Sequence, residues 1–292
     1  MDQLIKSLAF EDQFRIYVVD ATETVSEAQK RHETWNTATA ALGRTIVGTA
    51  LLGATLKGTE KVTVRIDGDG PAGHIVADGN GQGEVKGYIA NPKVSLPLTE
   101  NGKIDVKGAV GTTGNFMVTK DLGMKEPFSG QVPLVSGEIG EDFTYYMATS
   151  EQTPSAIGLS VLINQDETVR KAGGFMIQVL PGADEETIGK LEETLASMPM
   201  MSQLMDAGKT PEDILESITG KGNARILETM PISFTCSCSK ERFGNAIASL
   251  GYEEIQEMIE QDHGAEAVCH FCGEKHYFSE EELKAIQSEP TV

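Results

Sequence analysis

The sequence predicts an α+β protein: an N-terminal domain with mostly antiparallel sheets and a long helix, then a helical linker and a small C-terminal domain. Three observations predict this fold class. After Val62 the residues alternate between apolar and polar and are interrupted by DG and NG turns, as in antiparallel strands. At Pro181 the pattern changes to helical periodicity. All four cysteines lie in two tight pairs after position 235, which sets the last segment apart.

The first domain is predicted to span residues 1–180. Its first strand is FRIYVVDA at Phe14–Ala21. One long helix is expected from roughly Glu23 to Lys57, because apolar or small residues recur there every three to four positions. These positions are Val25, Ala28, Trp35, Ala38, Leu42 and Ile46. Later strands are predicted at 114–122, 128–135, 156–164 and 173–181.

The helical linker is predicted over residues 181–230. Its first helix begins after Asp184, a good N-cap residue, and Pro199 interrupts the pattern. A second short helix, TPEDILESI, begins with Thr210 as its cap. The glycine-containing stretch TGKGNAR at 219–225 is predicted to be a flexible joint.

The composition argues against several classes of partner. The formal charge is −20, which disfavours binding to nucleic acid or to an anionic membrane. The N-terminal stretch MDQLIKSLAFEDQFRIYVVD has acidic residues where a secretory signal would carry its basic and apolar regions. The most apolar stretch, TIVGTALLGATL, is too short to span a bilayer. We therefore expect a cytoplasmic protein with neither nucleic-acid nor membrane partners.

A nucleotide is not expected either. The segment GDGPAG at 68–73 matches G-x-G-x-x-G, but Pro71 lies inside it and a second strand follows in place of a helix. This arrangement favours a hairpin turn. The sequence also lacks a Walker A motif for ATP hydrolysis.

The cysteines carry the clearest chemical signal. A C-x-C pair, Cys236 and Cys238, is separated by thirty residues from a C-x-x-C pair, Cys269 and Cys272. Cytosolic thiols are kept reduced, so clustered cysteines there indicate metal binding or redox chemistry. Two such pairs can close a tetrahedral Zn²⁺ site, and four thiolates leave no open position for catalysis. The sequence thus predicts a zinc-binding domain over residues 231–292.

Spacing alone leaves the role of this site open. A structural zinc domain is the simplest interpretation, but each vicinal pair could also close into a strained, readily reduced disulfide. Three nearby histidines are not expected to be ligands because four sulfurs fill the shell. They are His263, His270 and His276. Three nearby basic residues would favour the thiolate form. They are Lys240, Arg242 and Lys275.

The linker is rich in methionine. Met198, Met200, Met201 and Met205 fall within eight residues. Methionine is flexible and polarizable, so it suits surfaces that accept many shapes. Equally, these side chains could fill the seam between two domains in the resting protein, and both roles are compatible if the seam opens.

With these motifs in place, the chain resembles the 33 kDa chaperonin (heat shock protein 33) family. The C-terminal C-x-C and C-x-x-C pairs carry the resemblance, and it extends over nearly the whole length. Matching segments include LLGATLKG, GDGPAGHIVADGNGQGEVKGY, TKDLGMKEPFSGQVPLVSGEIGEDFTYYMATSEQTPSAIGLSV and GGFMIQVLPGA.

The resemblance implies a stress-response holdase chaperone that needs no ATP and is not an enzyme. In its reduced, inactive state the four thiolates of Cys236, Cys238, Cys269 and Cys272 would hold one Zn²⁺. Oxidation would form the disulfides Cys236–Cys238 and Cys269–Cys272 and expel the metal. The C-terminal domain and the linker would then lose structure, unfolding client proteins would bind, and the active form would dimerise.

The residues support a physical version of this mechanism. Without zinc, the acidic C-terminal segment has a thin core and should unfold, which would deprive the linker helices of a packing partner. We expect their apolar face to bind clients. The candidate client-binding residues are Leu191, Leu195, Met198, Met201 and Met205.

Three other functions compete with this one. A passive zinc ribbon would not respond to peroxide. A thiol–disulfide oxidoreductase would use Cys269 and Cys272, but CHFC does not open a helix in a βαβ setting. A zinc hydrolase is the weakest option, because four thiolates leave the metal no open position.

Overall fold

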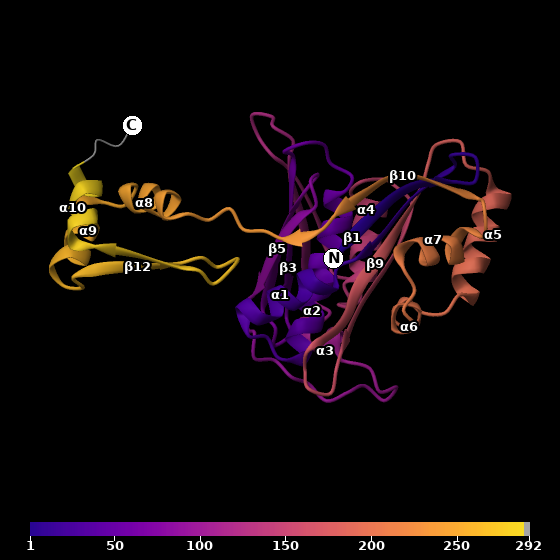
Figure 1. The fold of residues 1–292 in the computed structure, drawn as a ribbon, viewed down its shortest axis with the longest axis horizontal. Helices are drawn as coiled ribbons and strands as arrows, with labels where there is room; N and C mark the ends of the chain where they lie inside the picture. The colour runs from indigo at the N-terminus through magenta and orange to yellow at the C-terminus, as the bar shows by residue number, and fades with distance from the viewer. Residues whose placement is uncertain (289–292) are drawn as a thin grey trace. The chain divides into compact units, whose positions relative to one another are not determined.

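The computed structural model describes residues 1–288 and confirms the α+β class (Figure 1). It contains two compact units. The first is Met1–Thr235, and the second begins at Cys236. The segment 181–230, predicted as a linker, lies within the first unit.

One antiparallel sheet, sheet A, draws its strands from both ends of the first unit. Its spatial order is β10 (Ala224–Pro231), β1 (Gln3–Ala9), β2 (Phe14–Asp20), β9 (Val169–Val179) and β8 (Ser155–Ile163). Strand β1 pairs with β2 along its whole length, from Gln3 opposite Asp20 to Ala9 opposite Phe14. Neither β1 nor β10 was predicted from the sequence, and β10 begins inside the expected flexible joint.

The second sheet, sheet B, is built mainly from the meander predicted after Val62. Its order is β11 (Ser233–Phe234), β5 (Glu84–Ile89), β4 (His74–Asn80), β3 (Lys61–Gly68), β6 (Gly114–Asp121) and β7 (Phe128–Pro133). The GDGPAG segment is the turn of the β3–β4 hairpin, with Asp67 opposite His74, which confirms that prediction. All pairings are antiparallel except β11 with β5.

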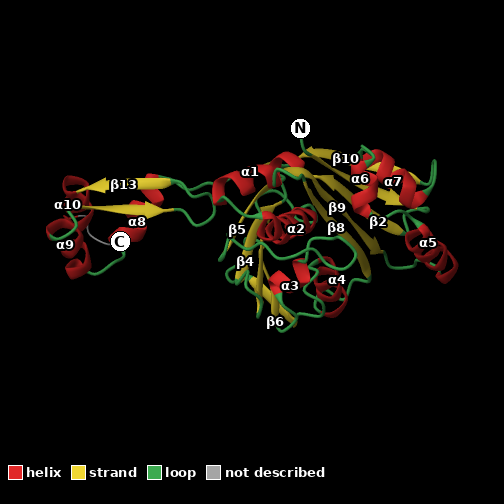
Figure 2. Ribbon diagram, turned by 90° about the horizontal axis from the view of Figure 1, so that it is seen from below, coloured by secondary structure: helices red, strands yellow, loops and turns green. Residues whose placement is uncertain are grey.

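Helix α2 forms the centre of the first unit, between the two sheets (Figure 2). The helices of this part are α1 (Thr22–His32), α2 (Asn36–Gly53), α3 (Val106–Val110) and α4 (Gly140–Thr149). Nearly every side chain of α2 is buried, as expected for a helix that is apolar or small on all sides. A Cβ atom at Gly48 would overlap the ring of Phe143, so glycine there permits close packing of α4.

The single long helix predicted for Glu23–Lys57 is wrong. The chain leaves the helix at Glu33, which adopts a left-handed conformation with φ of +48°, and a new helix begins at Asn36. The Trp35 amide donates to the carbonyl of Pro92 instead of continuing the helical ladder. Trp35 is consequently 47% exposed, although its periodicity placed it on the buried face.

The linker helices cover the face of sheet A opposite α2 (Figure 2). They are α5 (Glu185–Ser197), α6 (Met201–Asp206) and α7 (Pro211–Thr219). Asp184 caps α5 and Thr210 caps α7, as predicted. We call the apolar layer between these helices and sheet A the linker seam. Its buried residues are Ile5, Ala9, Phe14, Ile16, Val18, Phe175, Ile177, Leu191, Met201, Leu204, Met205, Ile214, Leu215 and Ile218.

The second unit is small. Its elements are α8 (Lys240–Ala248), α9 (Tyr252–Glu260), β12 (Gly264–Val268), β13 (Lys275–Ser279) and α10 (Glu280–Ser288). Its buried core is Ile247, Ile255, Ile259, Phe278 and Leu283, together with two cysteines. The strands β12 and β13 form an antiparallel hairpin that was not predicted. Within residues 1–288, no helix is both long and apolar enough to cross a membrane.

Candidate metal centre and linker seam

Two local structures bring the four cysteines together. Cys236 and Cys238 lie in the extended segment before α8, and Cys269 and Cys272 lie in the turn between β12 and β13. That turn is closed by the Cys269 amide, which donates to the carbonyl of Glu274 at 2.9 Å. Gly273 donates back to the carbonyl of Cys269 at 2.8 Å and has a φ of +72°, which favours glycine.

The sulfur positions fit a tetrahedral metal site. The Sγ atoms of Cys236 and Cys269 are 3.7 Å apart, and those of Cys238 and Cys272 are 3.4 Å apart. All four Sγ atoms lie within 4.8 Å of one another. A regular tetrahedron with Zn–S bonds of about 2.3 Å has sulfur–sulfur edges of about 3.8 Å. We call these four side chains the cysteine cluster.

The C-x-C segment is braced by α8. Arg242 donates from Nη1 to both the carbonyl and the hydroxyl oxygen of Ser237, each at 3.1 Å. Ser239 accepts from the amide of Arg242 and so caps the helix. The residues between and after the two cysteines therefore fix the direction in which the sulfurs point.

The four thiols differ in accessibility and in proton affinity. Cys269 and Cys272 are 7% and 3% exposed, whereas the other two are half-buried. Burial raises the pKa of the Cys238 and Cys272 thiols. Burial also acts on Cys269, but amide hydrogen bonds from Cys272 and Phe271 outweigh it and leave the pKa of Cys269 below its ordinary value.

Two of the three basic residues beside the cysteines do not act as the sequence implied. Lys240 pairs with Glu282 at 2.5 Å, and Lys275 pairs with Glu266 at 3.0 Å. Their charges are thus neutralised by carboxylates. Backbone amides rather than lysines favour the thiolate of Cys269.

Two further residues near the cluster were not predicted to be ligands from the sequence: Glu274 was not identified, and His276 was considered and excluded. Glu274 and His276 each place a ligand atom within 4.8 Å of the Sγ atom of Cys238. His276 had been set aside as a ligand because four sulfurs fill the zinc shell. Only the hairpin register brings positions 274 and 276 beside position 238, so no spacing rule could have found them.

The five predicted client-binding residues all lie in or beside the linker seam. Leu191, Met201 and Met205 are buried, and Leu195 and Met198 are partly buried. They belong to, or pack against, the apolar cluster that the linker helices share with sheet A. The seam belongs to the first unit and the cysteine cluster to the second, so the helices have a packing partner within their own unit.

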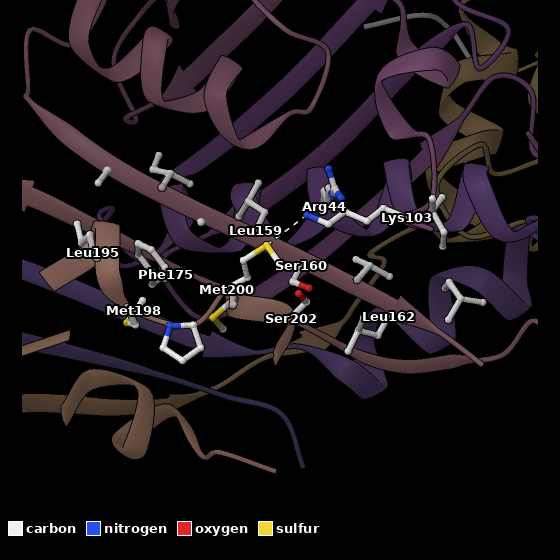
Figure 3. A pocket seen from close by; sticks show the side chains of 18 of the residues that line it. Arg44, Lys103, Leu159, Ser160, Leu162, Phe175, Leu195, Met198, Met200 and Ser202 are labelled. Carbon is white, nitrogen blue, oxygen red and sulfur yellow. Dashed lines mark hydrogen bonds between the residues drawn. The ribbon is translucent and has the colours of Figure 1, made fainter. Parts of the chain in front are cut away.

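A cavity of about 780 Å³ lies beside the seam (Figure 3). It is bordered by strand β8, an edge strand of sheet A, and by the α5–α6 connection. Leu195, Met198 and Phe175 contribute apolar walls, and Met200 is 48% exposed at the rim. The Nζ atom of Lys103 contacts the Sδ atom of Met200 at 3.2 Å.

Comparisons with known proteins identify the family. The model of the Hsp33 protein family matches residues 2–279. A 33 kDa chaperonin of Enterococcus faecalis is 59% identical over 288 residues, covering 99% of this chain and 97% of the relative. One from Latilactobacillus sakei is 58% identical over 289 residues, covering 99% of both chains.

A solved structure agrees with the sequence relatives. The crystal structure of the 33 kDa chaperonin (heat shock protein 33 homolog) from Thermotoga maritima matches with a TM-score of 0.90 and 40% identity. The match covers 98% of this chain and 97% of that one. Chaperones act by binding client proteins and are not a class of enzyme. This chain therefore belongs to the Hsp33 family of chaperones.

Proposed function

We propose that this chain is a redox-regulated, ATP-independent holdase that binds unfolding proteins during oxidative stress. The observation that carries the proposal is the cysteine cluster, whose sulfur spacings match the edges of a zinc–thiolate tetrahedron. We propose that the protein works in the cytoplasm, where thiols stay reduced until an oxidant arrives.

In the reduced state Cys236, Cys238, Cys269 and Cys272 hold one Zn²⁺, and the chaperone is inactive. The metal supplies folding free energy to the second unit, on the order of 10–16 kcal/mol in small zinc domains. This unit buries few apolar side chains. Residues 231–292 also contain 12 acidic and only 4 basic residues, so their mutual repulsion opposes folding without the metal.

Oxidation removes the ligands. Each cysteine pair loses two electrons to one molecule of peroxide, which is reduced to water, and a disulfide forms: Cys236–Cys238 and Cys269–Cys272. Disulfide sulfurs no longer act as thiolate ligands, so zinc leaves and the second unit unfolds. The proposed switch region is therefore 231–292, with 1–180 as a stable core and 181–230 as the responsive linker.

Client binding requires the linker seam to open, because its apolar residues are packed against sheet A. We propose that Leu191, Leu195, Met198, Met201 and Met205 contact clients once α5–α7 detach. The uncovered face of sheet A would add further apolar surface. Two such surfaces in one assembly would bind a client more tightly than one, which favours a homodimer as the active form.

The test is light scattering from an aggregating client without ATP, with a zinc-sensitive dye in the same cuvette. Protein oxidised by peroxide at raised temperature should suppress aggregation in step with zinc release, and its apparent mass should double. Equal behaviour of reduced and oxidised protein, with zinc retained, would leave a passive zinc ribbon as the better description.

A second experiment tests the client surface. Oxidised protein with Leu191, Met201 and Met205 changed to Ser should lose most of its holdase activity. The matched control changes Ile226 and Leu227 to Ser, since these are exposed apolar side chains on β10 outside the seam. Full activity in the seam variant would remove the seam from the mechanism while leaving the redox switch intact.

A further inference from the structure

A second set of metal-ligating side chains adjoins the cysteine cluster. Cys238, Glu274 and His276 place one ligand atom each within 4.8 Å of one another. We call these three residues the transfer set. Within residues 1–288, the cluster and the transfer set are the only groups of three or more such side chains at this spacing. Cys238 belongs to both.

Two of the three side chains in the transfer set have contacts that are compatible with metal binding. The Cys238 Sγ atom contacts the Oε2 atom of Glu274 at 3.7 Å. The Nε2 atom of His276 is buried and has no hydrogen-bond partner, although a buried polar atom without a partner costs free energy. His263 in the same unit differs, since its Nδ1 atom is paired with Glu280 at 2.9 Å. One ring nitrogen of His276 lies within 4.8 Å of the Cys238 Sγ atom, and an imidazole with an unpaired nitrogen is a ready metal ligand.

The donor chemistry suits zinc but differs from that of the cluster. Sulfur, nitrogen and carboxylate oxygen are all normal Zn²⁺ donors. Three protein ligands leave the fourth tetrahedral position open to water or to an incoming ligand, whereas four thiolates close the shell. A zinc ion held by the transfer set would therefore exchange readily with an external acceptor.

The burial of the ligand side chains indicates which of them lie nearer to solvent. Cys269 and Cys272 are buried, Cys238 is half-buried and Glu274 is exposed. Within the transfer set, the carboxylate of Glu274 thus lies on the solvent side of the shared sulfur, whereas the Nε2 atom of His276 is buried. The imidazole of His276 and the exposed carboxylate of Glu274 would therefore both be within reach of a metal ion that is still bound to Cys238.

We propose that Cys238, Glu274 and His276 form a transient zinc site through which the metal leaves and enters the cysteine cluster. The inference rests on the proposed function in one respect, that the cluster holds zinc. Each step would replace one ligand by another and would need no oxidant: the imidazole of His276 and the carboxylate of Glu274 would take the places of the Cys269 and Cys272 thiolates. Release of the Cys236 thiolate would then leave the open position. Peroxide then only has to trap the released thiolates.

The experiment measures zinc transfer from the full-length, zinc-loaded chain to an excess of a chromogenic chelator, without oxidant. The variants are Glu274→Gln, His276→Gln and the double change, with His263→Gln as the matched histidine control. We expect the double variant to transfer zinc about tenfold more slowly. This corresponds to an activation free energy for transfer that is higher by about 1.4 kcal/mol. The control should match the unchanged protein.

The sign of the effect separates this role from a structural one. If His276 and Glu274 only support the fold, removing them should loosen the unit and accelerate zinc loss. Unchanged or faster transfer in both Glu274→Gln and the double variant would overturn the proposal. Glu274 is exposed, so its substitution tests the rate without threatening the fold.

Two controls distinguish failure of this inference from failure of the proposed function. Zinc stoichiometry and the thiolate charge-transfer bands of the Co²⁺-substituted protein report whether four sulfurs hold the metal. If the unchanged protein lacks that signature, the proposed zinc switch itself fails. If the signature is present and the variants transfer zinc at the normal rate, only the transfer site is refuted.

Discussion

The two units of this chain are held together in different ways. The first surrounds a buried helix, α2, with two sheets and continues into a second apolar layer under the linker helices. The second has five buried apolar side chains and a cysteine cluster. The first unit has a large apolar core, whereas the second buries few apolar side chains, so under the proposed function its folding would depend on the bound metal. In the proposed mechanism this difference would make the second unit responsive to oxidation and leave the first unit unchanged.

The linker helices occupy an intermediate position. They pack on sheet A through one face only, and each is short. Short helices have little stability apart from their tertiary contacts. The linker helices therefore stay folded only while the seam is intact. We expect mutations to cost the most folding free energy in the cysteine cluster, less in the core of the first unit and least in the linker helices.

The largest effect is expected from loss of the cluster. Cys272→Ser removes one buried ligand and with it folding free energy on the order of 10 kcal/mol from the metal. Hydrogen exchange should lose protection throughout residues 236–288 while the two sheets keep theirs. Val268→Ser, an exposed change in the neighbouring strand, is the control. Retained protection after Cys272→Ser would mean that the second unit folds without its metal ligands.

A smaller but still large loss of stability is expected from a mutation in the core of the first unit. Phe143 is fully buried, with its ring 4.7 Å from that of Phe116. Phe143→Ala should lower the free energy of unfolding of the first unit by about 3–5 kcal/mol. Denaturant unfolding can be followed through the fluorescence of Trp35, the only tryptophan. Tyr145→Ala, on the exposed side of the same helix, should cost much less, and zinc content should not change in either variant.

The next effect concerns a buried carboxylate. Asp142 accepts hydrogen bonds from the amides of Val135, Ser136 and Ile139 at 2.8, 3.1 and 2.9 Å. It thereby holds Ile139 at a φ of +71°, an unfavourable value for a β-branched residue. Asp142→Asn should destabilise the first unit by about 1.5–3 kcal/mol, since charge-assisted bonds are lost. The exposed change Glu141→Gln should be nearly neutral, and the same denaturant unfolding experiment measures both variants.

The smallest effect tests the linker. Thr210 accepts from the amide of Asp213 and caps α7. Thr210→Ala should cost about 1 kcal/mol. Faster hydrogen exchange in α7, with β1 and β2 unchanged, would show that the helix opens separately from its sheet. Thr210→Ser keeps the hydroxyl cap and should restore normal exchange. If hydrogen exchange instead rises equally in β1 and β2, then the linker helices and sheet A unfold as one cooperative unit.

The sequence predicted the local features well. Asp184 and Thr210 were identified as caps because capping depends on residues within one turn. The cysteine cluster followed from two short spacings and from the rule that zinc takes four ligands. The β3–β4 hairpin followed from turn residues flanked by alternation.

Features that depend on distant pairing were missed. Strand β10 has mostly exposed side chains and no alternation, and it exists because β1, from the other end of the unit, pairs with it. The break at Glu33 depends on the amide of Trp35 finding the carbonyl of Pro92. The roles of Glu274 and His276 depend on hairpin register. None of these partners lies within the window that a periodicity argument can use.

The position of β10 in the chain also determines the order in which the elements would unfold if unfolding began at Cys236. Any unravelling that starts at Cys236 and runs towards the N-terminus reaches β11 first, then β10, and only then α7. Because β10 is an outermost strand paired with β1 alone, it can be stripped away without breaking another strand pair. Its departure would turn β1 into the new border of sheet A, with a row of vacant amide and carbonyl groups ready to accept an extended chain.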